Sequence, residues 1–66
     1  MQSKIIESNG EKCTVSGGKG YIVIYKTAGG VLTDVAGIVT HIDDMCITLE
    51  NKKKVLIEKI EKIIEI

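Results

Sequence analysis

Branching at the β-carbon is the feature that most constrains this chain. The 66 residues include 12 Ile, 6 Val and 5 Thr, so that 23 residues are β-branched, whereas Pro, Phe and Trp are absent. β-Branched side chains are stiff at χ1 and pack better on a pleated strand than on a helix. The composition therefore predicts an all-β domain.

The shortness of the chain limits both its architecture and its function. A chain of 66 residues forms one domain, which buries only about 60% of the surface that its unfolded form exposes. Such a domain has no room for a large internal active site, and its core is marginal without disulfides, a metal or self-association. We therefore expect a single domain over residues 1–66 that gains stability from assembly.

The charged residues argue against proteins that bind polyanions strongly. Nine Lys balance nine acidic residues, and the chain has no Arg. A net charge of zero gives no long-range attraction toward nucleic acid, and without Arg there is no planar group for bidentate contacts to phosphate or guanine. Sequence-specific reading of DNA is therefore disfavoured. The only basic run, which we interpret as a solvated turn that could hold a phosphate backbone loosely, is Lys52, Lys53 and Lys54.

The cysteines and the short apolar runs bear on the cellular compartment. Cys13 and Cys46 lie far apart and lack metal or redox spacing, whereas a secreted chain of this size usually carries four or more cysteines. No apolar stretch approaches the roughly 18 residues of a membrane span, and the first residues lack the apolar core of a signal peptide. We therefore expect a soluble, cytoplasmic protein without a membrane partner, in which both thiols act as small hydrophobic groups.

The first half of the chain divides into short strands. Asn9-Gly10 between two strand-like runs predicts a type I′ turn that joins Ser3–Ser8 to Glu11–Val15. A glycine-rich loop over residues 16–20 then precedes the apolar strand Tyr21–Tyr25. A strand that is apolar on both faces lies in the centre of a sheet, or has one face against another subunit.

The middle of the chain continues the same pattern. We expect a long strand over Val31–Ile42 that bends at Ala36-Gly37, because Gly inside a strand marks a bend or bulge. A turn at Asp43-Asp44 follows. Residues 45–50 then alternate as in a half-buried strand, with Met45 on the buried side.

The C-terminal segment admits two interpretations. A strand over Val55–Ile57 follows a turn at Asn51–Lys54, but the isoleucines of residues 58–66 have helical spacing, so a short helix is the alternative there. We prefer one 3-10 turn near Ile60 and a last strand over Ile63–Ile66, since every apolar residue of that strand is β-branched. The whole pattern predicts a small barrel of five to seven strands.

The middle of the chain also resembles the first signature of the Sm/Sm-like family, over residues 37–51, which read GIVTHIDDMCITLEN. In that family a Gly bends the second strand, an acidic turn follows, and an apolar pair with a later Leu forms the third strand. Similar spacing occurs in the YolD-like group and in SH3-like barrels, and the resemblance extends over Gly37 to Ile66. It implies a Sm-like or SH3-like barrel. The matching positions are Gly37, Met45, Ile47 and Leu49.

The residues through which Sm-like proteins bind uridine-rich RNA do not carry over. The family has an Asn that contacts the base, a neighbouring aromatic or His that stacks on it, and an Arg-Gly pair in the tail. The matching positions here hold Cys46, Asp44 and Glu58-Lys59, and the Asp of the turn is displaced by one position. The resemblance therefore implies the fold but not that RNA pocket.

The glycine-rich loop is the segment most suggestive of ligand binding. Consecutive Gly residues can aim backbone N–H groups at an anion, with a Lys as a point charge beside them. The loop is not a P-loop, because no Ser or Thr follows its Lys and no helix begins there. A flexible turn is the alternative interpretation. The candidate residues are Gly17, Gly18, Lys19 and Gly20.

Two tyrosines and the single histidine are the other candidates. Tyr21 and Tyr25 share one strand face, and they are either core or interface residues or a stacking platform for a base, with Lys19 and Lys26 beside it. His41 precedes two acidic residues, but one His and two turn carboxylates fall short of a metal site. We interpret it as a surface residue at a strand end, and expect no metal, cofactor or catalytic residue.

Two functions stay open at this point. The first is a non-enzymatic module that self-associates or binds another protein, predicted from the apolar strand Tyr21–Tyr25 and the Ile-rich tail. The second is an oligomeric protein that binds RNA or a small nucleotide through the glycine-rich loop, the two tyrosines, His41 and Lys52–Lys54. We expect no enzymatic activity, because nothing in the chain supplies a positioned acid–base pair.

Overall fold

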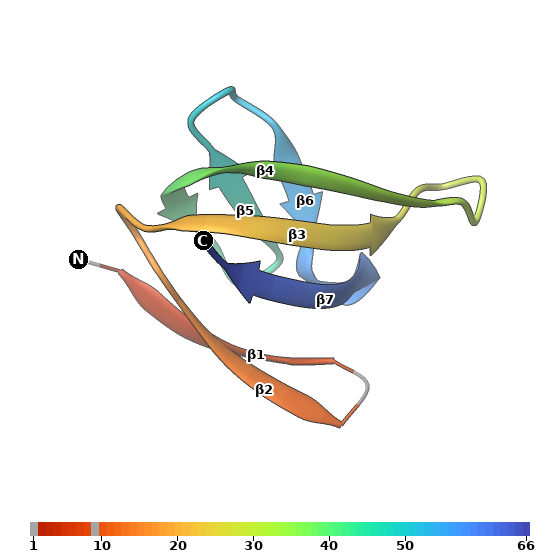
Figure 1. Ribbon diagram of the computed structural model, residues 1–66, viewed down its shortest axis with the longest axis horizontal. Helices are drawn as coiled ribbons and strands as arrows, with labels where there is room; N and C mark the ends of the chain where they lie inside the picture. The colour runs from red at the N-terminus through yellow and green to blue at the C-terminus, as the bar shows by residue number, and fades with distance from the viewer. Residues whose placement is uncertain (1, 9) are drawn as a thin grey trace.

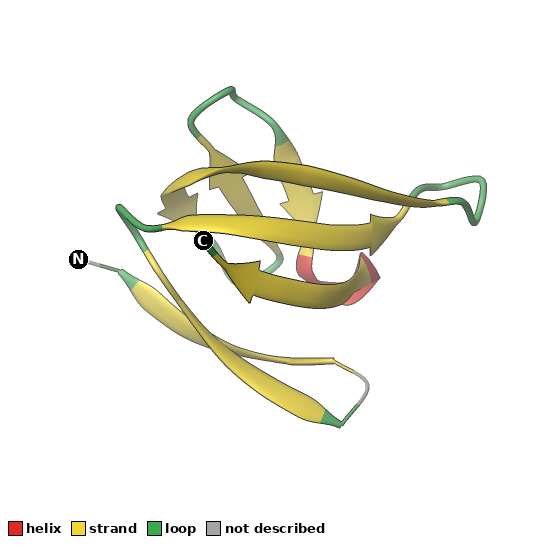
Figure 2. Cartoon of the chain, in the orientation of Figure 1, coloured by secondary structure: helices red, strands yellow, loops and turns green. Residues whose placement is uncertain are grey.

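The computed structural model describes residues 2–8 and 10–66, and these residues form an all-β protein, as predicted (Figure 1). They make seven strands and one 3-10 turn, which separates the last two strands (Figure 2). The elements are β1 (Ser3–Ser8), β2 (Glu11–Ser16), β3 (Gly20–Lys26), β4 (Leu32–Ile42), β5 (Cys46–Leu49), β6 (Lys54–Leu56), the 3-10 turn η1 (Ile57–Lys59) and β7 (Ile60–Glu65).

The strands form two antiparallel sheets. β1 and β2 pair as a hairpin, and the other five strands form a sheet in the order β6-β5-β4-β3-β7. Figure 1 shows β5 and β6 behind β3 and β4, with the hairpin alongside β7. The sheet is strongly curved but is not a closed barrel, because β6 and β7 stay at the two ends of the strand order and are joined only through η1.

The N-terminal hairpin agrees closely with the prediction. β1 pairs with β2 from Ser3 opposite Ser16 to Ser8 opposite Glu11, so that β2 is one residue longer than expected. Gly10 has a φ of +80°, the left-handed conformation that a type I′ turn needs. The part of the turn prediction that concerns Asn9 lies outside the described residues.

The bend in β4 lies later than predicted. The strand runs without interruption through Ala36-Gly37, and its register shifts between Val39 and His41 instead. β4 pairs with β3 as far as Ile38 and with β5 from Val39 onward. The extra residue, Thr40, therefore lies where β4 passes from pairing with β3 to pairing with β5. The position of Gly37 in the sequence did not indicate this place.

Two boundaries in the second half also differ from the expectation. Met45 is 67% exposed rather than buried, because the N–H of Asp43 donates to the carbonyl of Cys46 and keeps Met45 in the turn. β5 therefore begins at Cys46, although the alternation beyond it is confirmed. The 3-10 turn expected near Ile60 is confirmed as η1, but β7 begins at Ile60, three residues before the expected last strand over Ile63–Ile66.

The C-terminal segment is a strand, so the helical alternative is wrong. β7 lies antiparallel to β3 and pairs with it from Tyr21 opposite Glu65 to Tyr25 opposite Ile60, with one bulge. This pairing makes β3 the central strand of the three, as its apolar sequence predicted. The isoleucines at helical spacing are thus placed by strand pairing and not by a helix.

The core lies between the curved sheet and the hairpin. Strands of both sheets contribute to it, and among the described residues no polar or charged side chain is buried. Tyr21 and Val23 point into this core from β3, so the neighbouring residues of β3 must face the other way. The buried residues are Ile6, Val15, Tyr21, Val23, Val39, Ile42, Ile47, Leu49, Val55 and Ile60.

Candidate functional site

The side of β3 that faces away from the core is also apolar. Ile22 and Ile24 alternate with the buried residues and remain only half-buried, since the flanking strands β4 and β7 cover their edges. Residues directly opposite one another in a sheet share a face, so the strand register extends this surface across three strands. Each row has one residue from the β7 side, one from β3 and one from β4, and Ile66 is the residue just after β7. The rows are Ile66–Gly20–Ile38, Ile64–Ile22–Ala36 and Lys62–Ile24–Asp34.

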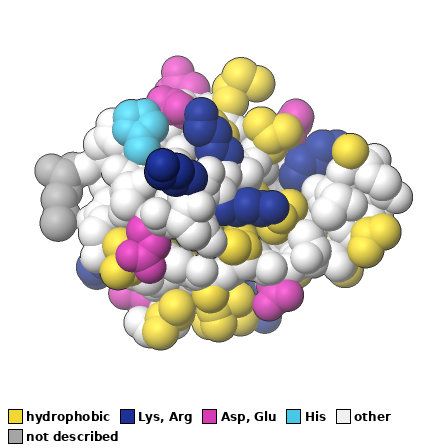
Figure 3. Space-filling model, turned by 90° about the horizontal axis from the view of Figure 1, so that it is seen from above, with side chains coloured by type: hydrophobic (Ala, Val, Ile, Leu, Met, Phe, Trp, Pro, Cys, Tyr) yellow, Lys and Arg dark blue, Asp and Glu magenta, His cyan; other side chains and the backbone are white. Residues whose placement is uncertain are grey.

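We call this three-row surface the outer face. Ile38, Ile64 and Ile66 are 41%, 42% and 75% exposed there, and these three rows hold one Lys and one Asp. The next row on the same side of β3 pairs the exposed Lys26 with Leu32. The face nearest the viewer in Figure 1 is seen edge-on along the bottom of Figure 3, and hydrophobic side chains gather there. Contiguous exposed apolar patches are uncommon on monomeric proteins and mark sites of interaction.

The glycine-rich loop does not form the predicted anion site. The N–H groups of Gly17 and Gly18 donate to backbone carbonyls of Gln2 and Val39, both at 2.8 Å, and the N–H of Lys19 donates to Ser16 at 3.4 Å. These groups tie the loop to the sheet, so they are not aimed at a ligand. The Nζ of Lys19 lies 3.6 Å from a carboxylate oxygen of Glu65, across the start of β3.

The two tyrosines do not form a stacking platform. Tyr21 is only 1% exposed, and its hydroxyl oxygen accepts a hydrogen bond from the backbone N–H of Ser16 at 2.9 Å. The interpretation as a core residue is therefore confirmed for Tyr21, whose ring has no free face for a base. Tyr25 is half-buried and packs against the edge of the core.

Tyr25 instead lines a hollow of about 190 Å³ between β6 and the turn that follows β3. Val55 and Leu56 add apolar surface, and Lys54 is the one member of the predicted basic run that reaches this hollow. No acidic residue lines it. The cationic lining residues are Lys26, Lys54 and Lys59.

The rest of the predicted basic run stays in the turn between β5 and β6. Lys52 adopts a left-handed φ of +66°, and Lys53 donates its N–H to the side chain of Asn51 at 3.0 Å. Figure 3 shows Lys side chains grouped on the face seen from above. Lys52 and Lys53 are exposed and neither lines the Tyr25 hollow, so the run is a solvated turn except at Lys54.

His41 is a surface residue, as predicted. Its Nε2 lies 2.9 Å from an oxygen of Asp43, and this hydrogen bond holds the pKa of the Asp43 carboxyl below its usual value. The thiol of Cys46 donates to the same carboxylate at 3.6 Å. Within residues 2–8 and 10–66, no three potential metal ligands come together, and both cysteines are free.

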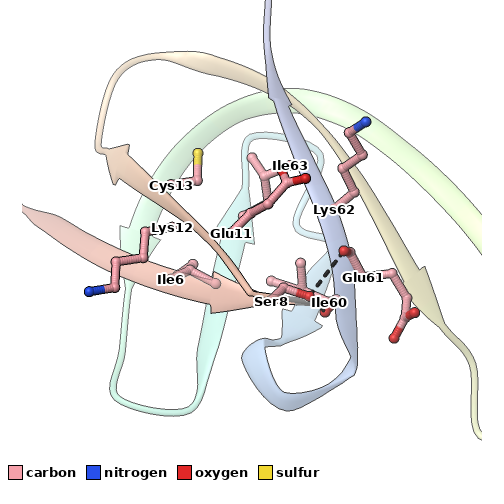
Figure 4. A pocket seen from close by; sticks show the side chains of 9 residues that line it. All are labelled: Ile6, Ser8, Glu11, Lys12, Cys13, Ile60, Glu61, Lys62 and Ile63. Atoms are coloured by element: carbon pink, nitrogen blue, oxygen red, sulfur yellow. Dashed lines mark hydrogen bonds between the residues drawn. The ribbon is translucent and has the colours of Figure 1, made fainter.

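A second hollow, of about 170 Å³, lies between the N-terminal hairpin and β7 (Figure 4). The hydroxyl of Ser8 points toward β7 and donates to the carbonyls of Ile60 and Glu61 at 2.7 and 3.0 Å. The lining mixes both charges, with Glu11 and Lys12 among the residues. This hollow is therefore a seam where the hairpin docks on the sheet. No sequence signal indicated it, because it depends on a contact between the two ends of the chain.

Comparisons with protein-family models, with curated proteins and with solved structures find no match to this chain. The resemblance to Sm-like and SH3-like barrels therefore stays a prediction. In the described part of the chain, no helix has the length and apolar character required to cross a membrane.

Proposed function

We propose that this protein is a non-enzymatic interaction module that self-associates through its outer face. The observation that carries the proposal is the second apolar surface of β3, which the register extends onto β4 and β7. A single small domain has one core, and that core already lies on the other side of β3. A second copy of the chain would bury the surplus apolar surface.

A standard interface would take a large share of the surface of so small a chain. A standard specific interface removes about 800 Å² of surface from each partner, which is roughly a fifth of the 4364 Å² that this chain exposes. Burying apolar surface contributes about 25 cal/mol per Å², from which the cost of association must be subtracted. The net stabilisation is therefore smaller than the buried area alone would give.

Sedimentation equilibrium over micromolar concentrations tests this function. The wild-type chain should show a mass above its 7.2 kDa monomer, and Ile64→Asp should shift it toward the monomer because the new carboxylate lies within the outer face. Ile5→Asp is the matched control, since Ile5 is 65% exposed but lies on the hairpin. A wild-type chain that sediments only as a monomer would exclude the proposal.

The proposal extends to the family and the compartment of the protein. The relation to Sm-like or SH3-like barrels that we propose rests on the sequence resemblance over residues 37–66. Two free cysteines support a reducing, cytoplasmic location. We also propose that the protein is not an enzyme, since the acid–base pair of His41 and Asp43 is exposed on the surface.

A second candidate function is the binding of RNA or a small nucleotide. The Tyr25 hollow supports it, because an aromatic ring beside three Lys and no acid offers both a stacking surface and charges for phosphate. Titration of the labelled protein with uridine monophosphate, followed by NMR, should shift the amides of Tyr25 and Leu56. Lys54→Ala should weaken that binding, whereas Lys53→Ala, in the solvated turn, should not. Shifts spread equally over all exposed Lys would exclude a specific site.

A further inference from the structure

We infer that two copies of this chain pack outer face against outer face about a twofold axis parallel to β3, with Lys62 of each copy paired with Asp34 of the other. The inference rests on the proposed self-association and adds the orientation of the two subunits. It is carried by the one row of the outer face that holds charged residues, Lys62–Ile24–Asp34.

The two charges lie on opposite sides of the same apolar residue. Ile24 is directly opposite Lys62 on β7 and directly opposite Asp34 on β4, so all three side chains project from the outer face at the same level along the strands. Neighbouring strands are about 4.8 Å apart, which separates the two backbones by about 10 Å. Both side chains are exposed, and among the described residues neither takes part in an ion pair.

A twofold rotation about an axis along β3 brings these charges together. The rotation exchanges the two flanks of the face and keeps each row at its own level, so β7 of one copy lies over β4 of the other. Lys62 then meets Asp34 of the partner subunit, and the symmetry makes the same contact a second time. Packed sheets are about 10 Å apart, a gap that one long and one short side chain from opposite faces can bridge.

The same rotation also places the apolar side chains of the two copies over one another. Ile64 is brought over the small side chain of Ala36 from the partner subunit, and Ile66 is brought over Ile38. Ile22 and Ile24 meet their own copies on the axis. At the Ile64–Ala36 contact a large side chain therefore lies over a small one, which favours close packing between the two faces.

The other two directions of a twofold axis fit the face less well. An axis in the plane of the sheet but across the strands would reverse the order of the rows, and would place Lys62 and Asp34 against the apolar row that contains Ile38 and Ile66. Charges that are buried without partners destabilise an interface strongly. An axis perpendicular to the sheet would set the strand edges side by side and leave the outer face exposed. Figure 1 shows β7, β3 and β4 as neighbouring strands of one layer, and Ile38, Ile64 and Ile66 on that face are exposed.

Reversal of the two charges, singly and together, tests the orientation. The dissociation constants of Asp34→Lys, Lys62→Asp and the double variant are measured by sedimentation equilibrium. Each single reversal should weaken the dimer at least about tenfold, because like charges meet at both ends of the symmetric interface. The double variant restores opposite charges, so its dissociation constant should return to within about threefold of the wild-type value.

Glu58→Lys and Lys53→Asp are the matched controls. They change the net charge by the same amounts at exposed positions outside the outer face, and should leave the dissociation constant unchanged. The orientation is overturned, and self-association is not, if the single reversals leave the dissociation constant unchanged or if the double variant stays dissociated. A wild-type chain that is monomeric overturns both.

Discussion

Replacing Tyr21 by Phe separates its role in the core from a role in ligand binding. The ring is 1% exposed, and its hydroxyl accepts a hydrogen bond of 2.9 Å from the backbone N–H of Ser16, at the end of β2. Phe fills the same space without that acceptor. The substitution therefore removes the acceptor of this hydrogen bond. The Ser16 N–H is left without an acceptor in a part-buried site.

The expected loss of stability follows from that orphaned donor. An unsatisfied buried donor costs about 1–3 kcal/mol, and partial access of water to Ser16 places the loss at about 1–2 kcal/mol. A chain of 66 residues has a free energy of unfolding of about 3–10 kcal/mol. The loss is thus a sizeable fraction of the total, and should lower the Tm by about 4–16 °C.

Urea denaturation followed by circular dichroism at a fixed protein concentration measures this loss. Tyr21→Phe should lower the midpoint without changing the m-value, because the surface exposed on unfolding stays the same. Tyr25→Phe is the matched control and should stay within about 0.5 kcal/mol of the wild type, since Tyr25 is half-buried and its hydroxyl makes no hydrogen bond among the described residues.

Hydrogen exchange gives a second and more local readout. The amide of Ser16 should exchange faster in Tyr21→Phe than in the wild type, by more than the global loss of stability explains. If Tyr21→Phe costs no more than Tyr25→Phe, and leaves exchange at Ser16 unchanged, the hydrogen bond has no structural role. The assignment of Tyr21 to the core would then lose its main energetic support.

Four further substitutions test other parts of the structure. Ser8→Ala removes the hydroxyl that docks the hairpin on β7, so the free energy of unfolding should fall by about 0.5–1.5 kcal/mol and the β1 amides should exchange faster. Gly30→Ala should cost about 1–2 kcal/mol in chemical denaturation because its φ is +80°, whereas Gly37→Ala should cost less, because a Cβ there meets its nearest neighbour at an ordinary 3.5 Å. His41→Ala should raise the pKa of the Asp43 carboxyl toward its usual value of 3.8 in an NMR titration, by removing the hydrogen bond that lowers it. Because that pKa is lowered in the folded protein, the contribution of Asp43 to stability is present above pH 3.8 and is lost as the pH falls through the lowered value. An unchanged pKa in His41→Ala would show that the bond is not formed in solution.

Most of the strands could be predicted from the sequence, because their signals are local. Alternation and β-branching identified β1, β2 and β3 to within one or two residues, and Gly10, which belongs to the predicted hairpin turn, has a left-handed φ. The errors fell where pairing partners change. The bulge near Thr40 and the start of β7 at Ile60 depend on which strand lies beside β4 or β7, and that is not a local property.

The candidate site was harder to predict than the fold. The glycine-rich loop had the composition of an anion site, but Gly17 and Gly18 use their N–H groups to hold the loop against Gln2 and Val39. Tyr21 and Tyr25 share a strand face, yet one ring is buried in the core and the other lies at its edge. Residue type and spacing do not show whether a donor or a ring is already satisfied inside the protein.

The sequence by itself determined that the chain is all-β and that the strand Tyr21–Tyr25 is apolar on both faces, since both follow from residue types at a period of two. Only the tertiary structure decided which face is the core and what surrounds the other. That decision depends on register, because pairing with β4 and β7 places Asp34 and Lys62 on either side of Ile24. A shift of one residue in either pairing would move these charges to the core side of the sheet. The outer face therefore exists only because strands distant in sequence pair in one register.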